Sequence, residues 1–417
     1  MFVLKAVIVT IGDEILTGHI VDTNAAWLAA RLSEIGFEVI KKISIGDDRE
    51  AIMATLKEMT GVTSLVLITG GLGPTPDDVT RKALFDFFES TPVEDPAVLR
   101  QVQSFMEKRG RPLTDLNRKQ ALVAHNCKVI PNNIGTAPGM WFEKRGTIFV
   151  AMPGVPFEMQ EMFNSYLQGM LKEHFALPSF IVRQVLLTGI GESFLAEEIK
   201  QWKKNLPPSI HLSYLPSPGM ITLRLTARDE NRDALEQEVE SQLRKLQTLI
   251  PSYIYGYDND TLEAVVGRML WEHGKTLSLA ESCTGGAIGR MIVNVPGASR
   301  YFKGGVIAYS NEIKINVLGV PESVLGNFGA VSRETVCAMA EGVRKLFDTD
   351  YAVAVSGIAG PEGGTEEKPV GTVWIAVTSK EETTAEKFSF GDDDRQRNIT
   401  KSAIAALNLL RKSIQII

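Results

Sequence analysis

The sequence predicts an α/β protein built from more than one domain. Its 417 residues exceed what one hydrophobic core usually supports, and its composition, 44% apolar and 23% charged, is that of a globular protein. In residues 1–90, segments with the pattern of strands alternate with segments with the pattern of helices, which is the order of a doubly wound sheet. We therefore expect three domains, at residues 1–175, 176–255 and 256–417.

The N-terminal domain is expected to be the doubly wound sheet. Its predicted elements are a strand at 3–10, a helix at 24–32, a strand at 39–45, a helix at 49–59, a strand at 65–69 and a helix at 79–88. A hairpin at 139–152 and a helix after Pro156 follow. In such a sheet the loops that follow the strands gather at one edge, and ligands bind there.

The rest of the chain is expected to form a small α+β unit and a second α/β domain. The small unit has predicted strands at 182–187 and 221–227, predicted helices at 193–202 and 233–246, and a predicted linker at 251–260. The last domain has predicted helices at 262–273 and 399–410, with strands at 306–309, 351–355 and 370–377 between them.

Charge, cysteine content and apolar runs exclude several classes of protein. The net charge of −6 and the pI of about 5.6 give no overall positive field for nucleic acid or anionic lipid. Cys127, Cys283 and Cys337 are far apart, so neither a disulfide framework nor a zinc site is expected. No signal peptide is recognisable, and no apolar run reaches about 18 residues. We expect a cytoplasmic protein that binds neither nucleic acid nor membrane.

One loop of the N-terminal domain is suited to a metal and a phosphate. It reads Gly70-Gly-Leu-Gly-Pro-Thr-Pro-Asp77-Asp78-Val-Thr80 and joins a strand to a helix. Its glycines let the backbone approach a ligand and direct amide hydrogens toward a phosphate, and the helix N-terminus adds its dipole. Asp77 and Asp78 would repel that anion unless they hold a metal. Helix capping is the alternative, but one cap needs one aspartate, so the pair favours a metal–phosphate site.

A second loop, after the first strand, reads Gly12-Asp-Glu-Ile-Leu-Thr-Gly-His-Ile-Val-Asp-Thr-Asn24, in which Asp13 and Glu14 either complete the metal shell or are solvated. Together with Thr136-Ala-Pro-Gly139 and Met152-Pro-Gly-Val-Pro156, the two loops resemble the molybdopterin-binding fold of the MoaB and MoeA type and the N-terminal domain of the CinA family. The resemblance implies hydrolysis of ADP-ribose to AMP and ribose phosphate with a divalent metal of the Mg, Mn or Co type. A molybdopterin-related reaction would use the same loops and stays open as an alternative.

The resemblance also implies roles for individual residues of this domain. The implied metal ligands are Asp13, Glu14, Asp77 and Asp78, of which Asp78 is also catalytic. The implied substrate contacts are Asn24, Gly70, Gly71, Gly73, Thr80, Asn117 and Gln120. A metal held by carboxylates would neutralise the diphosphate and activate a water for in-line attack.

The last domain contains a serine motif typical of a nucleophile. Ala280-Glu281-Ser282-Cys283-Thr284-Gly285-Gly286 follows a short apolar stretch, and amide groups beside the serine could stabilise an oxyanion. A helix cap is the alternative. Tyr309 and Lys314 follow about 30 residues later, and no histidine follows His273, so a Ser/Lys pair is favoured over a Ser-His-Asp triad. Without a histidine partner, Cys283 is expected to be a buried packing residue.

These segments resemble the C-terminal domain of the CinA family, which also occurs as the stand-alone PncC amidohydrolase. The resemblance implies deamidation of nicotinamide mononucleotide to nicotinic acid mononucleotide and ammonia, without a metal. It implies Ser282 as nucleophile, Lys314 as its base, Tyr309 as a residue that holds the pair, Ser356 beside the oxyanion or phosphate, and Arg395 on the phosphate. Further implied substrate contacts are Thr284, Gly285, Gly286, Gly360, Gly363 and Gly364. The family has Thr where Ser356 stands, and Arg397 competes with Arg395 because two extra aspartates alter the Gly-Asp-Arg motif.

The middle unit occupies the place of the KH-like connector of that family. It lacks the GxxG loop that clamps nucleic acid, so we expect a spacer that helps to form a homodimer. The favoured hypothesis is a bifunctional nucleotide hydrolase of NAD recycling. Two alternatives stay open: a molybdopterin-related enzyme with a degenerate C-terminal domain, and a non-catalytic competence or DNA-uptake accessory protein.

Overall fold

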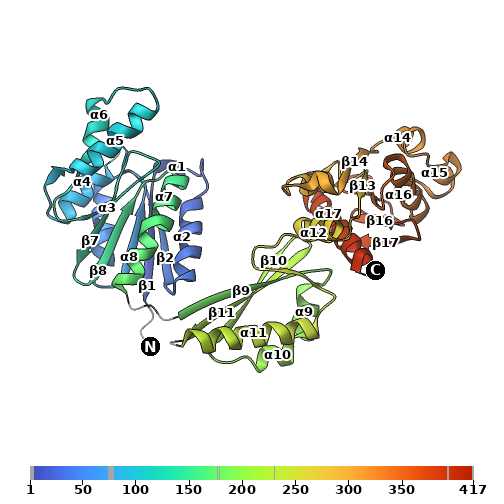
Figure 1. Cartoon of the computed structure of the whole chain (residues 1–417), viewed down its shortest axis with the longest axis horizontal. Coiled ribbons are helices and arrows are strands. Elements are labelled where there is room, and N and C mark those ends of the chain that lie inside the picture. The colour runs from blue at the N-terminus through green and yellow to red at the C-terminus, as the bar shows by residue number, and fades with distance from the viewer. Residues whose placement is uncertain are drawn as a thin grey trace. The chain divides into compact units, whose positions relative to one another are not determined.

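The computed structural model describes residues 4–73, 79–175, 177, 179–229, 231–391 and 394–415. The chain divides into two compact units, one of Met1–Ile181 with Arg228–Leu235 and the other of Val182–Ala227 with Glu236–Ile417. Sheets covered by helices make up both units, so the predicted α/β class is confirmed (Figure 1).

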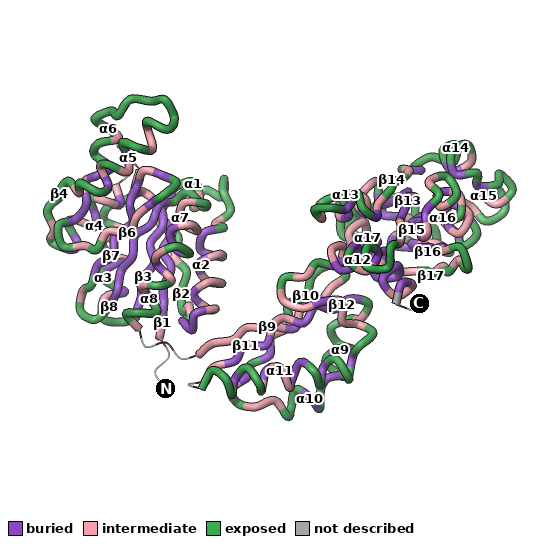
Figure 2. The backbone as a smooth tube through the Cα atoms, viewed as in Figure 1, coloured by how far each residue is buried: buried purple, intermediate pink, exposed green. Residues whose placement is uncertain are grey.

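The main sheet of the first unit has six strands in the order β2-β1-β3-β8-β7-β6. Its parallel strands are β2 (Glu38–Ile45), β1 (Lys5–Ile11), β3 (Leu65–Thr69) and β8 (Thr147–Met152). The strands β7 (Gly139–Lys144) and β6 (Lys128–Ile130) continue it in antiparallel pairing. Every residue of β3 and β8 is buried, because central parallel strands are covered on both faces (Figure 2).

Helices cover both faces of this sheet, as a doubly wound fold requires (Figure 1). On one face lie α2 (Thr23–Glu34), α7 (Pro156–Met162) and α8 (Gln168–His174). On the other lie α3 (Arg49–Met59) and α4 (Thr80–Phe87). The unit is completed by α1 (Asp13–Leu16), β4 (Pro92–Glu94), α5 (Pro96–Lys108), α6 (Asp115–Arg118) and β5 (Leu122–Ala124).

The middle of the chain forms a four-stranded sheet in the order β10-β11-β9-β12. Its strands are β9 (Ser179–Thr188), β10 (Ile210–Ser217), β11 (Met220–Asp229) and β12 (Ile254–Tyr257), and its helices are α9 (Glu192–Glu198), α10 (Lys200–Lys204) and α11 (Arg232–Leu249). The expectation that 251–260 is only a linker is wrong, because Ile254–Tyr257 pairs antiparallel with β9. The turn-forming residues around this short edge strand give it the composition of a linker.

The last part of the chain forms a five-stranded sheet in the order β14-β13-β15-β16-β17. Its strands are β13 (Leu277–Glu281), β14 (Phe302–Ile307), β15 (Tyr351–Gly357), β16 (Thr372–Thr378) and β17 (Thr383–Ser389); the first three run parallel to one another and the last two antiparallel to their neighbours. The helices α12 (Leu262–Glu272), α13 (Ala287–Val293) and α17 (Arg395–Gln415) contribute to the core on one face. The helices α15 (Glu322–Phe328) and α16 (Arg333–Phe347) contribute to the core on the other.

Within the part of the chain that the structure describes, no helix has both the length and the apolar character needed to span a membrane.

Candidate active site

Ser282 lies at the carboxyl edge of the C-terminal sheet. It directly follows β13, whose five residues are all buried, and β13 lies between β14 and β15. The backbone N–H of Ser282 donates a 3.0 Å hydrogen bond to the carbonyl of Val355 on β15, which fixes the start of the turn. The side chain therefore stands where the loops after three parallel strands converge, the usual place for a ligand in an α/β sheet.

Lys314 reaches Ser282 from the neighbouring loop and helix. It lies on α14 (Asn311–Asn316), which begins after β14, and Ser310 caps that helix. The side chain of Lys314 is 1% exposed, and its Nζ atom lies 3.1 Å from the Oγ atom of Ser282. Burial lowers the pKa of Lys314, because an ammonium ion loses its hydration in the interior.

Two carbonyl groups orient the amine of Lys314. The Nζ atom lies 2.7 Å from the oxygen of Ala308 and 3.4 Å from that of Tyr309. A neutral amine has two hydrogens and one lone pair. If its hydrogens are donated to these two carbonyls, the lone pair is left to accept the hydroxyl hydrogen of Ser282. The arrangement is therefore that of a general base beside a nucleophile.

Cys283, the neighbour of Ser282, is not poised to react. It is buried in the core that α12, α13 and α17 cover, and burial raises the pKa of its thiol to about 12. Because the thiolate is the nucleophilic form, the thiol is inert at neutral pH.

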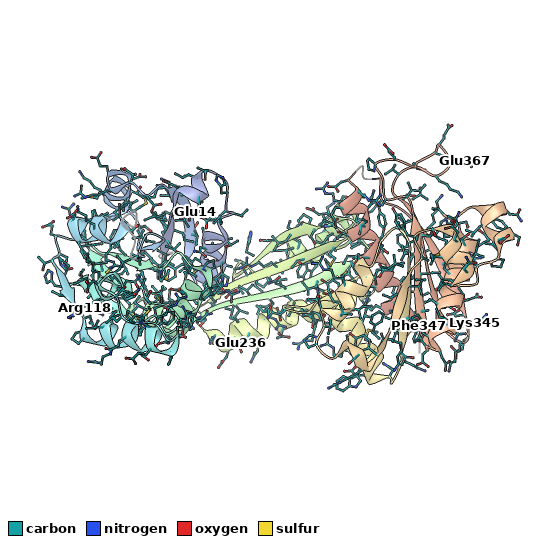
Figure 3. All side chains as sticks on the ribbon, turned by 90° about the horizontal axis from the view of Figure 1, so that it is seen from above. Glu14, Arg118, Glu236, Lys345, Phe347 and Glu367 are labelled. Carbon is teal, nitrogen blue, oxygen red and sulfur yellow. The ribbon has the colours of Figure 1, made fainter. Side chains whose placement is uncertain are left out.

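A cavity of about 200 Å³ lies in front of the Ser282–Lys314 pair. It is lined by Ser282, Cys283, Tyr309, Asn311, Lys314, Ala330, Val331, Ser356, Gly357, Ala359 and Arg395. Asn311 was missed by sequence reasoning, although its place two residues after Tyr309 could have indicated it. Gly363 and Gly364 are exposed in the loop after β15 and do not line this cavity. Glu367, labelled in Figure 3, belongs to the same loop.

Ser356 faces the cavity from β15. It is almost fully buried, and its hydroxyl donates a 2.7 Å hydrogen bond to the carbonyl of Ala330. With its hydrogen used there, the hydroxyl offers only lone pairs to a ligand. Ser356 is therefore placed to accept a hydrogen bond from a ligand N–H and is not placed to stabilise an oxyanion.

Arg395, at the start of α17, lies at the rim of the cavity. Its guanidinium donates to the carbonyl of Gly360 at 2.7 Å and to the hydroxyl of Tyr309 at 3.1 Å. The choice between the two arginines therefore favours Arg395, since Arg397 does not line the cavity.

The expected role of Tyr309 needs correction. Its side chain is 62% exposed and its hydroxyl accepts from Arg395, while its backbone carbonyl accepts the hydrogen bond from Lys314.

The amide groups after Ser282 are only partly available to a ligand. Gly285 and Gly286 have left-handed backbones, with φ of 60° and 99°, which glycine adopts at little cost. The N–H of Gly285 donates to the carbonyl of Ser282, and that of Gly286 donates to the carboxylate of Glu281. These two amides are therefore occupied within the protein and are not free to hold an oxyanion. The N–H groups of Cys283 and Thr284 have no acceptor among the described residues.

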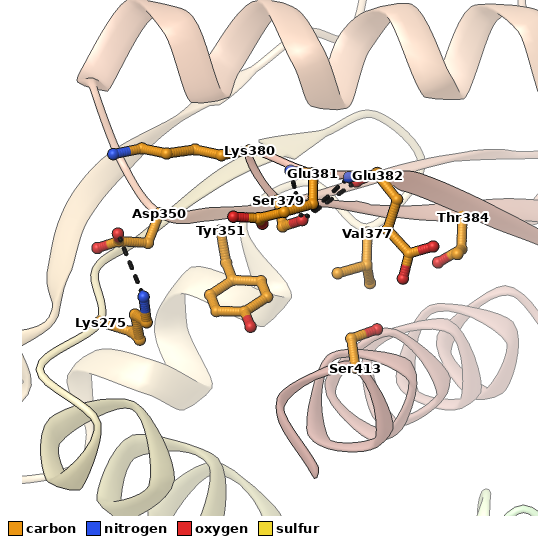
Figure 4. A pocket seen from close by; sticks show the side chains of 10 residues that line it. All are labelled: Lys275, Asp350, Tyr351, Val377, Ser379, Lys380, Glu381, Glu382, Thr384 and Ser413. Carbon is orange, nitrogen blue, oxygen red and sulfur yellow. Dashed lines mark hydrogen bonds and ion pairs between the residues drawn. The ribbon is translucent and has the colours of Figure 1, made fainter. Parts of the chain in front are cut away.

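A larger cavity, of about 530 Å³, lies at the opposite edge of the same sheet, before β13 and β15 (Figure 4). It is lined by Lys275, Asp350, Tyr351, Val377, Ser379, Lys380, Glu381, Glu382, Thr384 and Ser413. Its two lysines are outnumbered by three carboxylates, so it does not attract an anionic ligand. It is also separated from Ser282 by the length of β13.

In the first unit, the two predicted loops follow β1 and β3, which are neighbours where the strand order reverses. Gly70 must be glycine, because its φ is 114° and a Cβ there would collide with the carbonyl of Ile11. A Cβ at Gly71 would collide with the hydroxyl of Thr80, so the glycine loop lies directly against α4. The loops are thus brought together at the carboxyl edge of the sheet, where a ligand is expected.

Three of the predicted substrate contacts are buried with an unpaired polar atom. Asn24 Oδ1, Thr80 Oγ1 and Gln120 Oε1 have no hydrogen-bond partner among the described residues, although all three side chains are buried. The other end of Asn24 donates to the carbonyl of Gly154 at 2.7 Å. Buried polar atoms without partners are rare, so each favours a ligand. Asn117 differs, because it takes part in the cap of α6, where its Oδ1 accepts from Thr114.

Two of the four predicted metal ligands, Asp77 and Asp78, lie outside the described residues. Asp13 accepts a hydrogen bond from the backbone of Asp47, and Glu14 is exposed (Figure 3). Within the described ranges, no three His, Cys, Asp or Glu side chains gather as a metal site. The four-carboxylate set therefore stays a prediction.

Comparison with known proteins agrees with this arrangement of parts. The family model described as a probable molybdopterin binding domain matches residues 7–173, the one described as the damage-inducible protein CinA KH domain matches 183–256, and the one described as the CinA C-terminal domain matches 259–414. A crystal structure of competence/damage inducible protein CihA from Agrobacterium tumefaciens is 34% identical and covers 37% of this chain and 97% of that one, with a TM-score of 0.36.

Two relatives extend the match to nearly the whole chain. A CinA-like protein of Cytophaga hutchinsonii is 45% identical over 99% of this chain and 98% of the relative. A putative competence-damage inducible protein of Caldicellulosiruptor bescii is 40% identical over 99% of both chains. With this identity over 99% of its length and all three family models in order, the chain belongs to the CinA family.

Proposed function

We propose that the C-terminal domain is an amidohydrolase that converts nicotinamide mononucleotide to nicotinic acid mononucleotide and ammonia. The observation that carries this proposal is the buried Ser282–Lys314 pair, with 3.1 Å between hydroxyl and amine and a lysine pKa lowered by burial. A serine hydroxyl needs a base to become a nucleophile, and a neutral lysine supplies one where no histidine is near.

In the proposed reaction, Ser282 Oγ attacks the amide carbon while Lys314 takes the hydroxyl proton. The N–H groups of Cys283 and Thr284 would stabilise the oxyanion that forms on the carbonyl oxygen. Collapse of this intermediate breaks the carbon–nitrogen bond, and Lys314 returns the proton to the departing ammonia. Lys314 then takes a proton from a water, whose oxygen attacks the ester carbon. The bond from that carbon to Ser282 Oγ breaks, Lys314 returns the proton to Ser282 Oγ, and the product acid leaves and ionises to its carboxylate. No step of this mechanism requires a metal.

The cavity supports an amide substrate on an anionic nucleotide. Ser356 offers an acceptor, which suits the NH₂ group of a carboxamide and disfavours the carboxylate of the product. At about 200 Å³ the cavity is smaller than a site for a whole drug-sized ligand, so it suits the pyridine ring alone. The phosphate would then lie at the rim, where Arg395 supplies a positive charge and planar donors.

We also propose that the N-terminal domain hydrolyses ADP-ribose to AMP and ribose phosphate. Asn24, Thr80 and Gln120 each have a buried polar atom without a partner in the part of the chain that the structure describes, which supports a ligand with several hydroxyl groups at the glycine loop. The carboxylates of Asp13 and Glu14 are the oxygen donors that a divalent cation prefers, and Asp77 and Asp78 would complete that set. Such a cation, when bound, would neutralise the diphosphate and lower the pKa of an attacking water.

The two proposals are tested with one purified protein. Ammonia release from nicotinamide mononucleotide should be measured for the wild type and for Ser282→Ala, and AMP release from ADP-ribose for both. We expect wild-type protein to perform both reactions and Ser282→Ala to perform only the second. If the protein performs neither reaction but converts a molybdopterin substrate, the molybdopterin-related role is favoured. If it performs none of the three reactions, the non-catalytic accessory role is favoured.

A further inference from the structure

Glu281, the last residue of β13, has a buried carboxylate directly before the nucleophile. Its side chain is 3% exposed, and no lysine or arginine lies within ion-pair distance of it among the described residues. Instead it accepts hydrogen bonds from three backbone N–H groups, those of Gly286 at 3.0 Å, Ile288 at 3.2 Å and Gly289 at 2.8 Å. The first turn of α13 therefore binds an anion that the chain itself supplies.

This contact decides which amides of the turn are occupied within the protein. The amides that Glu281 occupies are closed to a substrate oxyanion and to a substrate phosphate. The N–H of Gly285 is used by the carbonyl of Ser282, and that of Ala287 by the carbonyl of Thr284. Only the amides of Cys283 and Thr284 stay without an acceptor among the described residues of this turn.

Glu281 is also connected to the lysine of the pair. Its backbone carbonyl accepts a 2.8 Å hydrogen bond from the N–H of Ala308, and the carbonyl of Ala308 accepts from Lys314 Nζ at 2.7 Å. The side chain of Glu281 thus holds the turn that carries Ser282. The backbone carbonyl of Glu281 holds Ala308, whose own carbonyl orients Lys314.

We propose that Glu281 is a positioning residue whose carboxylate holds the turn 282–286 so that the amides of Cys283 and Thr284 face the developing oxyanion. It acts through this turn and does not touch the substrate. The proposal rests on the amidohydrolase function proposed above. It adds that the nucleotide phosphate does not bind at α13, since the carboxylate of Glu281 already occupies those amides.

Replacement by glutamine is the direct test. Glu281→Gln keeps the shape of the side chain but directs N–H hydrogens toward backbone N–H groups, so the turn must shift. Because an oxyanion donor acts in the transition state, kcat for ammonia release should fall at least about tenfold while KM changes less than about threefold. Glu281→Asp keeps the charge but retracts it by one methylene, and its kcat should be intermediate. This second variant carries the test if the glutamine variant does not fold.

Asp350→Asn is the matched control in the same sheet. Asp350 also accepts from a backbone N–H, that of Thr276 at 2.9 Å, but at the opposite edge. Its loss should lower the melting temperature and leave kcat unchanged. The proposal is overturned if folded Glu281→Gln has a kcat within threefold of that of Asp350→Asn. It is also overturned if Glu281→Gln raises KM while its kcat stays at the wild-type value.

A reagent that reacts with Ser282 directly tests the role of Glu281 independently of the proposed substrate. An alkyl fluorophosphonate reacts when Ser282 Oγ forms a bond to phosphorus, fluoride leaves and Lys314 takes the proton, and the adduct is followed by intact mass. We expect labelling of Glu281→Gln at least about tenfold slower than that of Asp350→Asn. If wild-type protein releases no ammonia but this difference is found, the proposed substrate is wrong and the positioning role stands. Equal labelling rates would refute the positioning role.

Discussion

Lys314 Nζ lies 3.1 Å from Ser282 Oγ in a buried site, and no acidic side chain among the described residues forms an ion pair with it. Buried lysines are rare unless they are paired with a carboxylate, because an unpaired ammonium is costly to remove from water. A buried lysine with a lowered pKa that lines a cavity is typical of a functional site. The stability of the domain and the basicity of its proposed catalytic group are therefore linked through one side chain.

The pH dependence of activity should follow the lowered pKa of Lys314. The base acts only when neutral, so kcat/KM for ammonia release should fall as the pH drops through that pKa and level off above it. A profile measured from pH 6 to 10 checks this. A rate that is flat across the range, or that falls as the pH rises, would contradict the assignment of Lys314 as base.

The stability of the domain should depend on pH through the same group. The folded pKa of Lys314 is lowered below the unfolded value of about 10.4, so the unfolded state binds more protons between the two values. The contribution of Lys314 to the free energy of unfolding is therefore unfavourable at low pH and improves as the pH rises toward 10.4. Lys314→Met removes this dependence. Its stability relative to wild type, measured by urea unfolding, should decline as the pH rises, and a constant difference would contradict the burial argument.

Ser282 and Lys314 should behave as one catalytic unit. Ser282→Ala and Lys314→Met should each reduce kcat by about 10³ or more, and the double variant should lose little more, because members of one unit are strongly non-additive. Cys283→Ala is the matched neighbour, since its thiol has a pKa of about 12 and packs in the core. It should keep activity within a few-fold. An active Ser282→Ala beside an inactive Cys283→Ala would transfer the nucleophile to sulfur.

The sequence predicts the Ser282–Lys314 pair but not how its surroundings are used. The motif and the absence of a later histidine indicate the pair, and the strand pattern indicates that both residues follow neighbouring strands. The direction of the Tyr309 ring could not be predicted, because it depends on the contact with Arg395, 86 positions away. The hydrogen bond from the Gly286 amide to the Glu281 carboxylate was also missed. The motif brings these polar groups close together in sequence, but it does not determine which donor pairs with which acceptor.

The limits of prediction are similar for the fold. The helix at 49–59 and the strand at 65–69 are predicted to the residue, since their apolar patterns are strong and their ends are marked by an aspartate cap and a glycine. The strand Ile254–Tyr257 was read as a linker, because four residues at a sheet edge carry too little pattern of their own. Its place is set by pairing with β9, a partner distant in sequence.

The hydroxyl of Thr80, which has no hydrogen-bond partner among the described residues, gives a prediction for the N-terminal domain. Thr80→Val should leave the melting temperature unchanged or raise it, because it removes a buried polar atom without a partner, while ADP-ribose hydrolysis falls at least about tenfold. The control is Thr147→Val. Thr147 is equally buried but donates to the carbonyl of Thr63 at 2.7 Å, so its loss should destabilise the fold. If Thr80→Val hydrolyses ADP-ribose normally, its hydroxyl does not serve the substrate.

The two proposed activities should respond separately to loss of the metal site. Asp78→Asn removes a carboxylate ligand and keeps a similar shape, so ADP-ribose hydrolysis should be abolished while ammonia release continues at the wild-type rate. EDTA should have the same effect on the wild type, because the Ser282–Lys314 mechanism has no metal step, and added Mg, Mn or Co ions should restore AMP release. Ser282→Ala is the reciprocal control, with ammonia release lost and AMP release retained.

If EDTA stops both reactions and one divalent ion restores both, the two halves share a metal requirement and the separate mechanisms proposed here are wrong. If Asp78→Asn keeps AMP release within a few-fold of wild type, the metal assignment alone fails, and the amidohydrolase proposal is unaffected.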